Sequence, residues 1–177
     1  MPETLELLNQ ATRLEGEGKV EEAMQAYDQA VEREPENGMA FLFRGCLFTR
    51  EHNYARALED FARALELNPD LRRLRDSEVA RRVESALHIF AWETSVDQED
   101  PDSHVHLARA HGLFGRYPEA MQAIGNALRL RPNHEPAHEL AVKLGIEGGL
   151  LPEAMRSLQH FLQARPKDPE LYLLLSQ

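Results

Sequence analysis

Two histidines and a glutamate in the C-terminal half have the spacing of a zinc-hydrolase motif. The stretch His134-Glu135-Pro136-Ala137-His138 fits H-E-x-x-H, in which two histidines on one helix face bind zinc and the glutamate acts as a base. This chemistry needs one continuous helix through both histidines. Because a proline such as Pro136 belongs in the first turn of a helix, His134 is expected outside it. We favour a chance match and keep a zinc hydrolase as an alternative.

The remaining candidates for chemistry are His104, His106, His111 and Cys46. Residues two apart on a helix point to different sides, so His104 and His106 do not easily share a metal, whereas His104 and His111 share a face. We favour packing between helices for these histidines, and a pH-sensitive or metal-responsive groove is the alternative. A thiol nucleophile at Cys46 needs a nearby base, and the nearest, His52, is expected in a turn. The sequence therefore predicts no catalytic residue, no metal site and no cofactor.

The composition predicts a folded protein that binds neither nucleic acid nor membranes. The chain has 177 residues, 42 % of them hydrophobic, and a formal net charge of −10. Phosphate contacts need clustered Lys and Arg, and no apolar run approaches the roughly 18–20 residues of a membrane span. The first residues show no signal peptide, and a single cysteine forms no internal disulfide. We therefore expect a cytoplasmic protein.

Two pairs of prolines have the same spacing. Pro35 and Pro69 are 34 residues apart, and so are Pro132 and Pro166. A fixed period of this length predicts stacked units, each too small to bury its own apolar face. The residues before the prolines repeat as well: Ala23, Tyr27 and Ala30; Ala57, Phe61 and Ala64; Ala120, Ile124 and Ala127; Ala154, Leu158 and Phe161.

Each unit is expected to contain two helices, because its apolar residues follow helical spacing and nothing alternates with period two. The expected units of this single array cover residues 4–37, 38–71, 72–100, 101–134 and 135–168, and residues 169–177 start a further helix or cap. The third unit is degenerate. Residues 72–100 form either a shortened pair or one long helix from about Ser77 to Asp97, because no Gly or Pro interrupts them. The apolar end of the chain makes self-association plausible.

The 34-residue units, with Gly45, Ala57, Phe61, Ala64 and Pro69 in order, resemble tetratricopeptide repeats over residues 4–168. The resemblance implies an all-α fold, a right-handed α-solenoid (superhelix) of antiparallel helix pairs. It also implies a concave groove, lined by the first helix of each pair, in which family members bind peptides or partner proteins. The register of the repeats predicts the groove residues: Leu5, Leu8, Thr12, Met39, Leu42, Cys46, Val105, Arg109, Glu139 and Lys143.

The predicted groove is apolar in its N-terminal half and charged in its C-terminal half. An apolar groove suits an amphipathic helix or a hydrophobic segment of a partner. One subfamily binds acidic chaperone tails through a clamp of Lys, Asn and Arg, but the matching positions here are Leu8, Thr12 and Phe43, which do not grip carboxylates. Outside the groove, Glu78 and Arg82 are expected to form an i,i+4 pair on a solvated face.

The leading hypothesis is a non-enzymatic scaffold or adaptor that captures a peptide or a partner helix. The alternatives are a chaperone for an export substrate, similar to the small acidic repeat chaperones of bacterial secretion systems, and the repeat segment of a larger protein.

Overall fold

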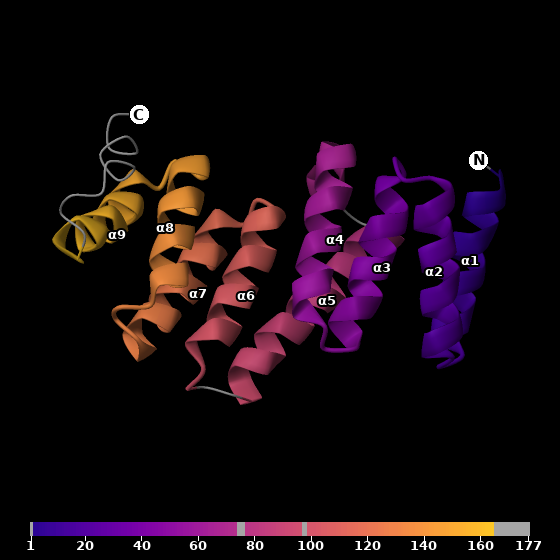
Figure 1. Cartoon of the computed structure of the whole chain (residues 1–177), viewed down its shortest axis with the longest axis horizontal. Helices are drawn as coiled ribbons and strands as arrows, with labels where there is room; N and C mark the ends of the chain where they lie inside the picture. The colour runs from indigo at the N-terminus through magenta and orange to yellow at the C-terminus, as the bar shows by residue number, and fades with distance from the viewer. Residues whose placement is uncertain (1, 74–76, 97–98, 165–177) are drawn as a thin grey trace. The chain divides into compact units, whose positions relative to one another are not determined.

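The computed structural model describes residues 2–73, 77–96 and 99–164, and these are helical apart from short connections. Figure 1 shows the helices in chain order. They are α1 (Pro2–Gly16), α2 (Val20–Arg33), α3 (Gly38–Arg50), α4 (Tyr54–Leu67), the 3-10 turn η1 (Pro69–Arg73), α5 (Glu78–Val96), α6 (Pro101–Leu113), α7 (Tyr117–Leu130), α8 (Glu135–Glu147) and α9 (Leu151–Ala164). The expected stub at 169–177 lies outside the described residues. The prediction of an all-α solenoid of helical repeats is confirmed.

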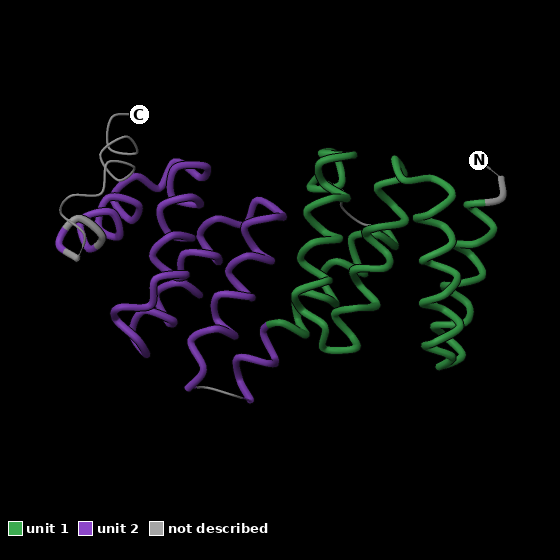
Figure 2. The backbone as a smooth tube through the Cα atoms, in the orientation of Figure 1, with its two compact units in different colours: residues 1–90 green, residues 91–177 purple. Residues whose placement is uncertain are grey.

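The chain divides into two compact units, residues 1–90 and 91–177, shown in green and purple in Figure 2. The first contains the pairs α1/α2 and α3/α4 and most of α5, and the second contains the pairs α6/α7 and α8/α9. Where the sequence left a choice for residues 72–100, the structure has a single long helix, α5. None of the helices in the described residues is both long and apolar enough to cross a bilayer.

Each pair is closed by a turn with one residue in the left-handed backbone region. The first unit has Gly18 with φ 76° and His52 with φ 57°, and the second has Gly115 with φ 71° and Gly149 with φ 70°. Both spacings equal the 34-residue period, so the period fixes the turn as well as the helices. His52 adopts a conformation that favours glycine, and its Nδ1 lies 2.7 Å from the hydroxyl of Tyr54.

Small residues at the helix contacts explain why the repeat sequence recurs. Ala23 and Ala30 are fully buried on either side of Tyr27, which is also fully buried. A Cβ atom at Gly45 would lie 2.8 Å from the ring of Phe61 on α4, so α3 approaches α4 closely only because this position is glycine. In the first unit the recurring alanines thus pack on either side of one large buried residue.

Candidate functional site

The first unit contains an apolar pocket between α1, α3 and the start of α5. Its volume is about 380 Å³. The residues that line it are Leu5, Leu8, Asn9, Thr12, Asn37, Met39, Phe43, Glu78 and Arg82. Four of them, Leu5, Leu8, Thr12 and Met39, are among the residues predicted from the register of the repeats. We call this cavity the apolar pocket.

The four predicted residues contribute differently to the apolar pocket. Leu5 is 60 % exposed, whereas Leu8 is only 5 % exposed and belongs to the core between α1 and α2. Met39 is half-buried and packs against the same core. The Thr12 hydroxyl lies 3.4 Å from the Tyr27 hydroxyl, within hydrogen-bond distance. Among the four predicted residues, Leu5 and Met39 are therefore the apolar side chains available to a ligand.

Two other predicted groove residues of the first unit are buried in the protein itself. Leu42 is fully buried and does not line the apolar pocket. Cys46 is 5 % exposed and lies in a second pocket of about 380 Å³, beside Ala86 and Ile89 of α5. Burial raises the pKa of the Cys46 thiol to about 12, so the thiol stays protonated at neutral pH and is a poor nucleophile.

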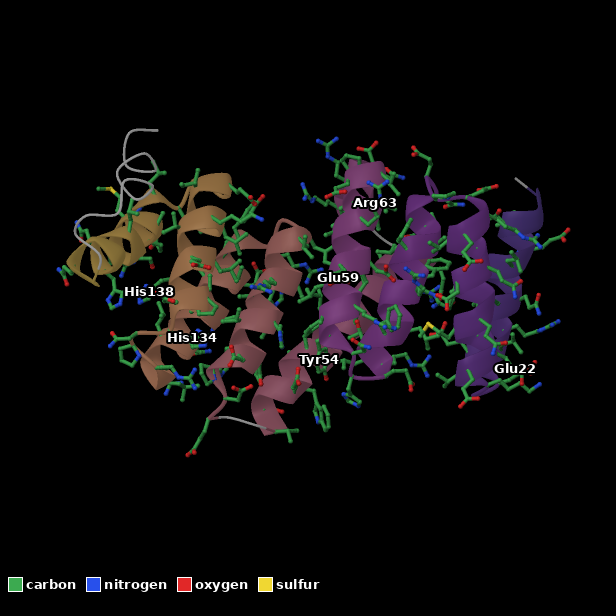
Figure 3. The ribbon with its side chains drawn as sticks, in the orientation of Figure 1. Glu22, Tyr54, Glu59, Arg63, His134 and His138 are labelled. Atoms are coloured by element: carbon green, nitrogen blue, oxygen red, sulfur yellow. The ribbon has the colours of Figure 1, made fainter. Side chains whose placement is uncertain are left out.

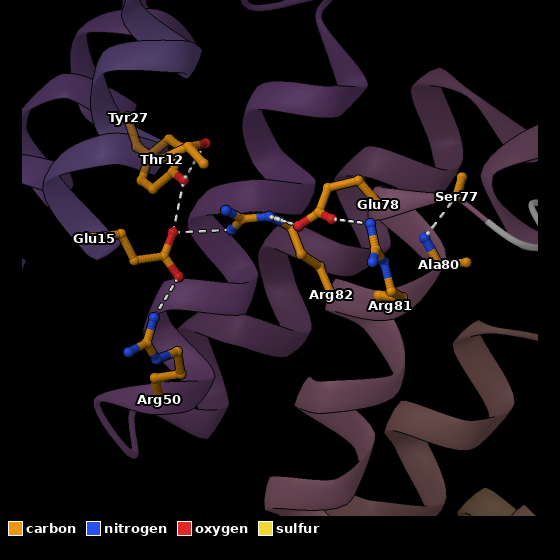
Figure 4. A network of polar contacts seen from close by, with 9 residues as sticks. All are labelled: Thr12, Glu15, Tyr27, Arg50, Ser77, Glu78, Ala80, Arg81 and Arg82. Atoms are coloured by element: carbon orange, nitrogen blue, oxygen red, sulfur yellow. Dashed lines mark hydrogen bonds and ion pairs between the residues drawn. The ribbon is translucent and has the colours of Figure 1, made fainter. Parts of the chain in front are cut away.

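An ion-pair network is centred on Glu15 (Figure 4), and its member Arg82 lines both pockets. The Glu15 carboxylate accepts hydrogen bonds from Arg50 Nη1 at 2.6 Å, Arg82 Nη1 at 2.9 Å and the Tyr27 hydroxyl at 2.9 Å. The Arg82 guanidinium also lies 4.8 Å from the centroid of the Phe43 ring. Residues from α1, α2, α3 and α5 thus meet at one carboxylate, and we call this arrangement the Glu15 site.

The network keeps its members charged despite their burial. Burial raises the pKa of Glu15, but hydrogen bonds and charge from Arg82, followed by hydrogen bonds from Arg50 and Tyr27, outweigh it and leave the pKa below its usual value. Burial lowers the pKa of Arg82, but Glu15 outweighs it, so the pKa is raised. Burial also raises the pKa of Tyr27 to about 12. At neutral pH the Glu15 site is therefore a carboxylate paired with two cations.

Sequence reasoning did not find the Glu15 site. The predicted pair between Glu78 and Arg82 is present, with 3.6 Å between Glu78 Oε1 and Arg82 Nε, but the prediction of a solvated face is wrong for Arg82, whose side chain is only 13 % exposed. The shorter contact of Arg82, however, is to Glu15, which is 67 residues away in the chain. No local pattern signals a contact of that range. The only available signal was an acidic residue on the expected inner helix of the first pair.

In the second unit the apolar residue predicted for the groove is buried, and the charged ones are exposed. Val105 is 3 % exposed and belongs to a core cluster between α6, α7 and α8. The side chains of Arg109, Glu139 and Lys143 are exposed, so their charges are accessible to a partner. That they line a groove remains a prediction.

The H-E-x-x-H segment lacks the geometry of a zinc site (Figure 3). His134 caps the N-terminus of α8, where its Nδ1 accepts a hydrogen bond from Ala137 N–H at 3.3 Å and its Nε2 lies 3.1 Å from Asp102 Oδ1. His138 uses Nε2 on the carbonyl oxygen of Pro132 at 2.9 Å. Both ring nitrogens of His134 are thus engaged within the protein. Among the described residues, no three His, Cys, Asp or Glu side chains are grouped closely enough to hold a metal ion.

The other histidines lie against the packed helices of the second unit. His104 is 8 % exposed and His106 is half-buried. Burial, together with the charge of Arg129, lowers the pKa of His104, and burial together with Arg109 lowers that of His106. Both imidazoles are therefore biased to the neutral form, which fits a role in packing.

Known proteins that resemble this chain contain the same kind of repeat. Two family models, both described as tetratricopeptide repeat, match residues 8–72 and 113–177. The chain is 26 % identical to the tetratricopeptide repeat and J domain-containing co-chaperone DNJ1 of Fusarium oxysporum f. sp. lycopersici, over 96 % of this chain and 35 % of that protein. It is also 26 % identical to the Hsp70-Hsp90 organizing protein 3 of Arabidopsis thaliana, over 88 % of this chain and 29 % of that protein. The chain spans about a third of the length of these relatives.

Two solved structures of repeat proteins align with most of the chain at low identity. The crystal structure of YrrB, described as a TPR protein with an unusual peptide-binding site, has a TM-score of 0.47 and 16 % identity, and the match covers 97 % of this chain and 91 % of that chain. The thermophilic TPR protein TTC0263 of Thermus thermophilus has a TM-score of 0.46 and 19 % identity, and the match covers 98 % of this chain and 97 % of that chain. The two family models, together with the paired helices and the 34-residue period, show that the chain belongs to the tetratricopeptide repeat family.

Proposed function

We propose that this protein is an interaction adaptor whose first unit binds a peptide or a partner helix in the apolar pocket. The family is one of protein-interaction scaffolds, and the apolar pocket is the observation that carries the proposal. Its apolar lining comes from α1 and α3, the first helices of two successive pairs. We include a cytoplasmic location in the proposal, because the single cysteine is a buried free thiol.

The energetic argument rests on Leu5 and Met39. Leu5 is 60 % exposed at the pocket, so a partner that covers it gains apolar burial that folding leaves unused. Full burial of one leucine side chain is worth about 1.5–3 kcal/mol. Half-buried Met39 is flexible and polarizable, and it adapts to the shape of an apolar ligand. An aliphatic or aromatic anchor residue on the partner is the ligand group that fits best.

The test uses selection from a displayed peptide library with three proteins: the native chain, Leu5→Glu and Leu151→Glu. Leu151 is 56 % exposed on α9 in the other unit, so its variant is a matched control for placing a charge on an exposed leucine. We expect the native chain and Leu151→Glu to enrich the same apolar peptides. We expect Leu5→Glu to bind these peptides at least tenfold more weakly, with an unchanged helical CD spectrum. Equal binding by Leu5→Glu would refute the proposed pocket.

The names of the curated relatives favour a second candidate, a chaperone-associated adaptor. Those relatives are a J domain co-chaperone and an Hsp70-Hsp90 organizing protein. Three positions that correspond to the clamp for acidic tails, Leu8, Thr12 and Phe43, all line the apolar pocket and carry no positive charge. A partner chaperone would therefore be held through an apolar segment. Titration with a synthetic peptide that ends in three acidic residues and a free carboxylate separates the modes, since tight binding would support a carboxylate clamp instead.

A further inference from the structure

We propose that the Glu15 site is an arginine-binding site, in which Arg82 of this chain occupies the place of an arginine from the partner. The inference rests on the proposed function and specifies the chemistry of the partner: a segment with an arginine one helical turn from an apolar residue. The apolar residue enters the apolar pocket, and the arginine replaces Arg82 on Glu15.

The Glu15 site has the groups that recognise a guanidinium. Its carboxylate has a side chain only 6 % exposed, and the neighbouring ring of Phe43 lies 4.8 Å from the Arg82 guanidinium carbon. A buried carboxylate and an aromatic face together favour arginine over lysine, because the guanidinium is planar, weakly hydrated and able to stack. Tyr27 and Arg50 orient the carboxylate through their own hydrogen bonds. The site therefore stays ordered when its cation is exchanged.

Arg82 satisfies this site incompletely. It donates one hydrogen bond to Glu15, through Nη1, and within the described part of the chain its buried Nε makes no hydrogen bond and only a longer ion-pair contact of 3.6 Å with Glu78 Oε1. Arg44 shows the stronger arrangement in the same unit, since its Nε and Nη2 donate to the two carboxylate oxygens of Asp60, both at 2.8 Å. An arginine that approaches from the pocket is not constrained by the backbone of α5 and can direct two N–H groups at the site.

The position of Arg82 leaves room for this exchange. Arg82 and Glu78 line both the apolar pocket and the second pocket, so the Arg82 side chain is accessible from two cavities of about 380 Å³ each. Glu15 already lines the second pocket, and rotation of the Arg82 side chain would open it to the apolar pocket while α5 keeps its buried residues, among them Val83 and Phe90. With 30 acidic and 20 basic residues, the chain also favours a cationic partner electrostatically.

The test compares three proteins in library selection: the native chain, Arg82→Met and the double variant Glu15→Gln/Arg82→Met. Methionine keeps an apolar stem against Phe43 and removes the competing cation. We expect Arg82→Met to enrich peptides with an arginine three or four positions from an apolar residue, the native chain to enrich them less, and the double variant not at all. CD spectra and thermal midpoints verify that each variant is folded.

A matched pair of peptides gives the quantitative result. The probe is the most enriched arginine peptide, and its control carries citrulline, an uncharged isostere, in place of the arginine. On Arg82→Met we expect the arginine peptide to bind at least tenfold tighter than the citrulline peptide, and on the double variant we expect a ratio near one. No arginine enrichment, or equal affinities on Arg82→Met, would overturn the inference. Apolar peptides that Leu5→Glu fails to bind would still support the proposed function in that case.

Discussion

Because α3 approaches α4 closely at Gly45, we expect the substitution Gly45→Ala to lower the stability of the fold. A Cβ atom there would lie 2.8 and 2.9 Å from two ring carbons of Phe61 and 3.2 Å from Asp60 Cβ. The optimum for carbon pairs is about 3.5–4.0 Å. Phe61 is fully buried and Asp60 is held by Arg44, so neither neighbour yields easily.

The magnitude follows from two opposing terms. Overpacking of a well-packed core costs about 1–3 kcal/mol, and this contact falls toward the upper end because the clash involves a buried ring. Alanine recovers up to about 1 kcal/mol through its better helix propensity. We therefore expect Gly45→Ala to lower the free energy of unfolding by about 1–2 kcal/mol, which corresponds to a decrease of roughly 2–8 °C in the thermal midpoint.

Gly125 supplies the matched control. It lies within α7 and is exposed, and a Cβ atom there would meet nothing within 4 Å. Gly125→Ala should therefore raise stability by up to about 1 kcal/mol through helix propensity alone. The measurement is urea unfolding followed by CD at 222 nm for the three proteins. If Gly45→Ala proves as stable as the native chain, the packing argument for the repeat glycine is wrong.

Three further predictions concern titration and reactivity. Burial, and then the nearby His160 and His134, lower the pKa of His138, although the hydrogen bond with the Pro132 carbonyl raises it. The unfolded state therefore binds this proton at a higher pH than the folded state, so the free energy of unfolding should fall as the pH drops below about 6.5. His138→Phe should reduce this fall, as thermal melts at several pH values will show. Tyr27→Phe removes the 2.9 Å hydrogen bond to Glu15 and should lower the free energy of unfolding by about 1–3 kcal/mol in urea titrations. The buried thiol of Cys46, with its pKa raised to about 12, should react with a disulfide reagent only after unfolding, as absorbance measurements will show.

Each of these predictions has a clear contrary outcome. Melts of His138→Phe that fall with pH as steeply as those of the native chain would remove His138 as the cause, and His88→Gln, on an exposed position of α5, is the control. An unchanged urea midpoint in Tyr27→Phe would show that the hydroxyl contributes nothing at Glu15. Full thiol reaction within minutes under native conditions would contradict the burial of Cys46.

The sequence predicted the repeating part of the fold because the period is a local signal. Alanine and glycine at fixed positions allow the helices of a pair to pack closely. The turn residues Gly18 and His52 recur with the same 34-residue spacing as the prolines. At residues 72–100 the period fails, and periodicity alone did not decide between one helix and two. The structure has α5 there, and its course follows from contacts such as Tyr54 with Phe90, whose ring centroids are 4.9 Å apart.

The candidate site was predictable only in part for the same reason. Register identified Leu5 and Met39 as lining residues, because these positions depend on α1 and α3 alone. It did not predict that Cys46 is covered, since residues of α5 line the pocket beside it. Nor did it predict the Glu15 site, which needs a residue 67 positions further along the chain.

That long separation has a consequence for synthesis of the protein on the ribosome. When α1 and α2 have emerged, Glu15 has Tyr27 but neither arginine, and Arg82 follows 49 residues after Arg33, the last residue of α2. At a translation rate of about 5–20 residues per second this delay lasts roughly 2–10 s. During that interval the first helical hairpin exposes a carboxylate and a leucine-lined surface to other molecules. Nascent chains stalled before residue 82 should therefore be more susceptible to proteases and to chaperone capture than chains stalled well beyond α5.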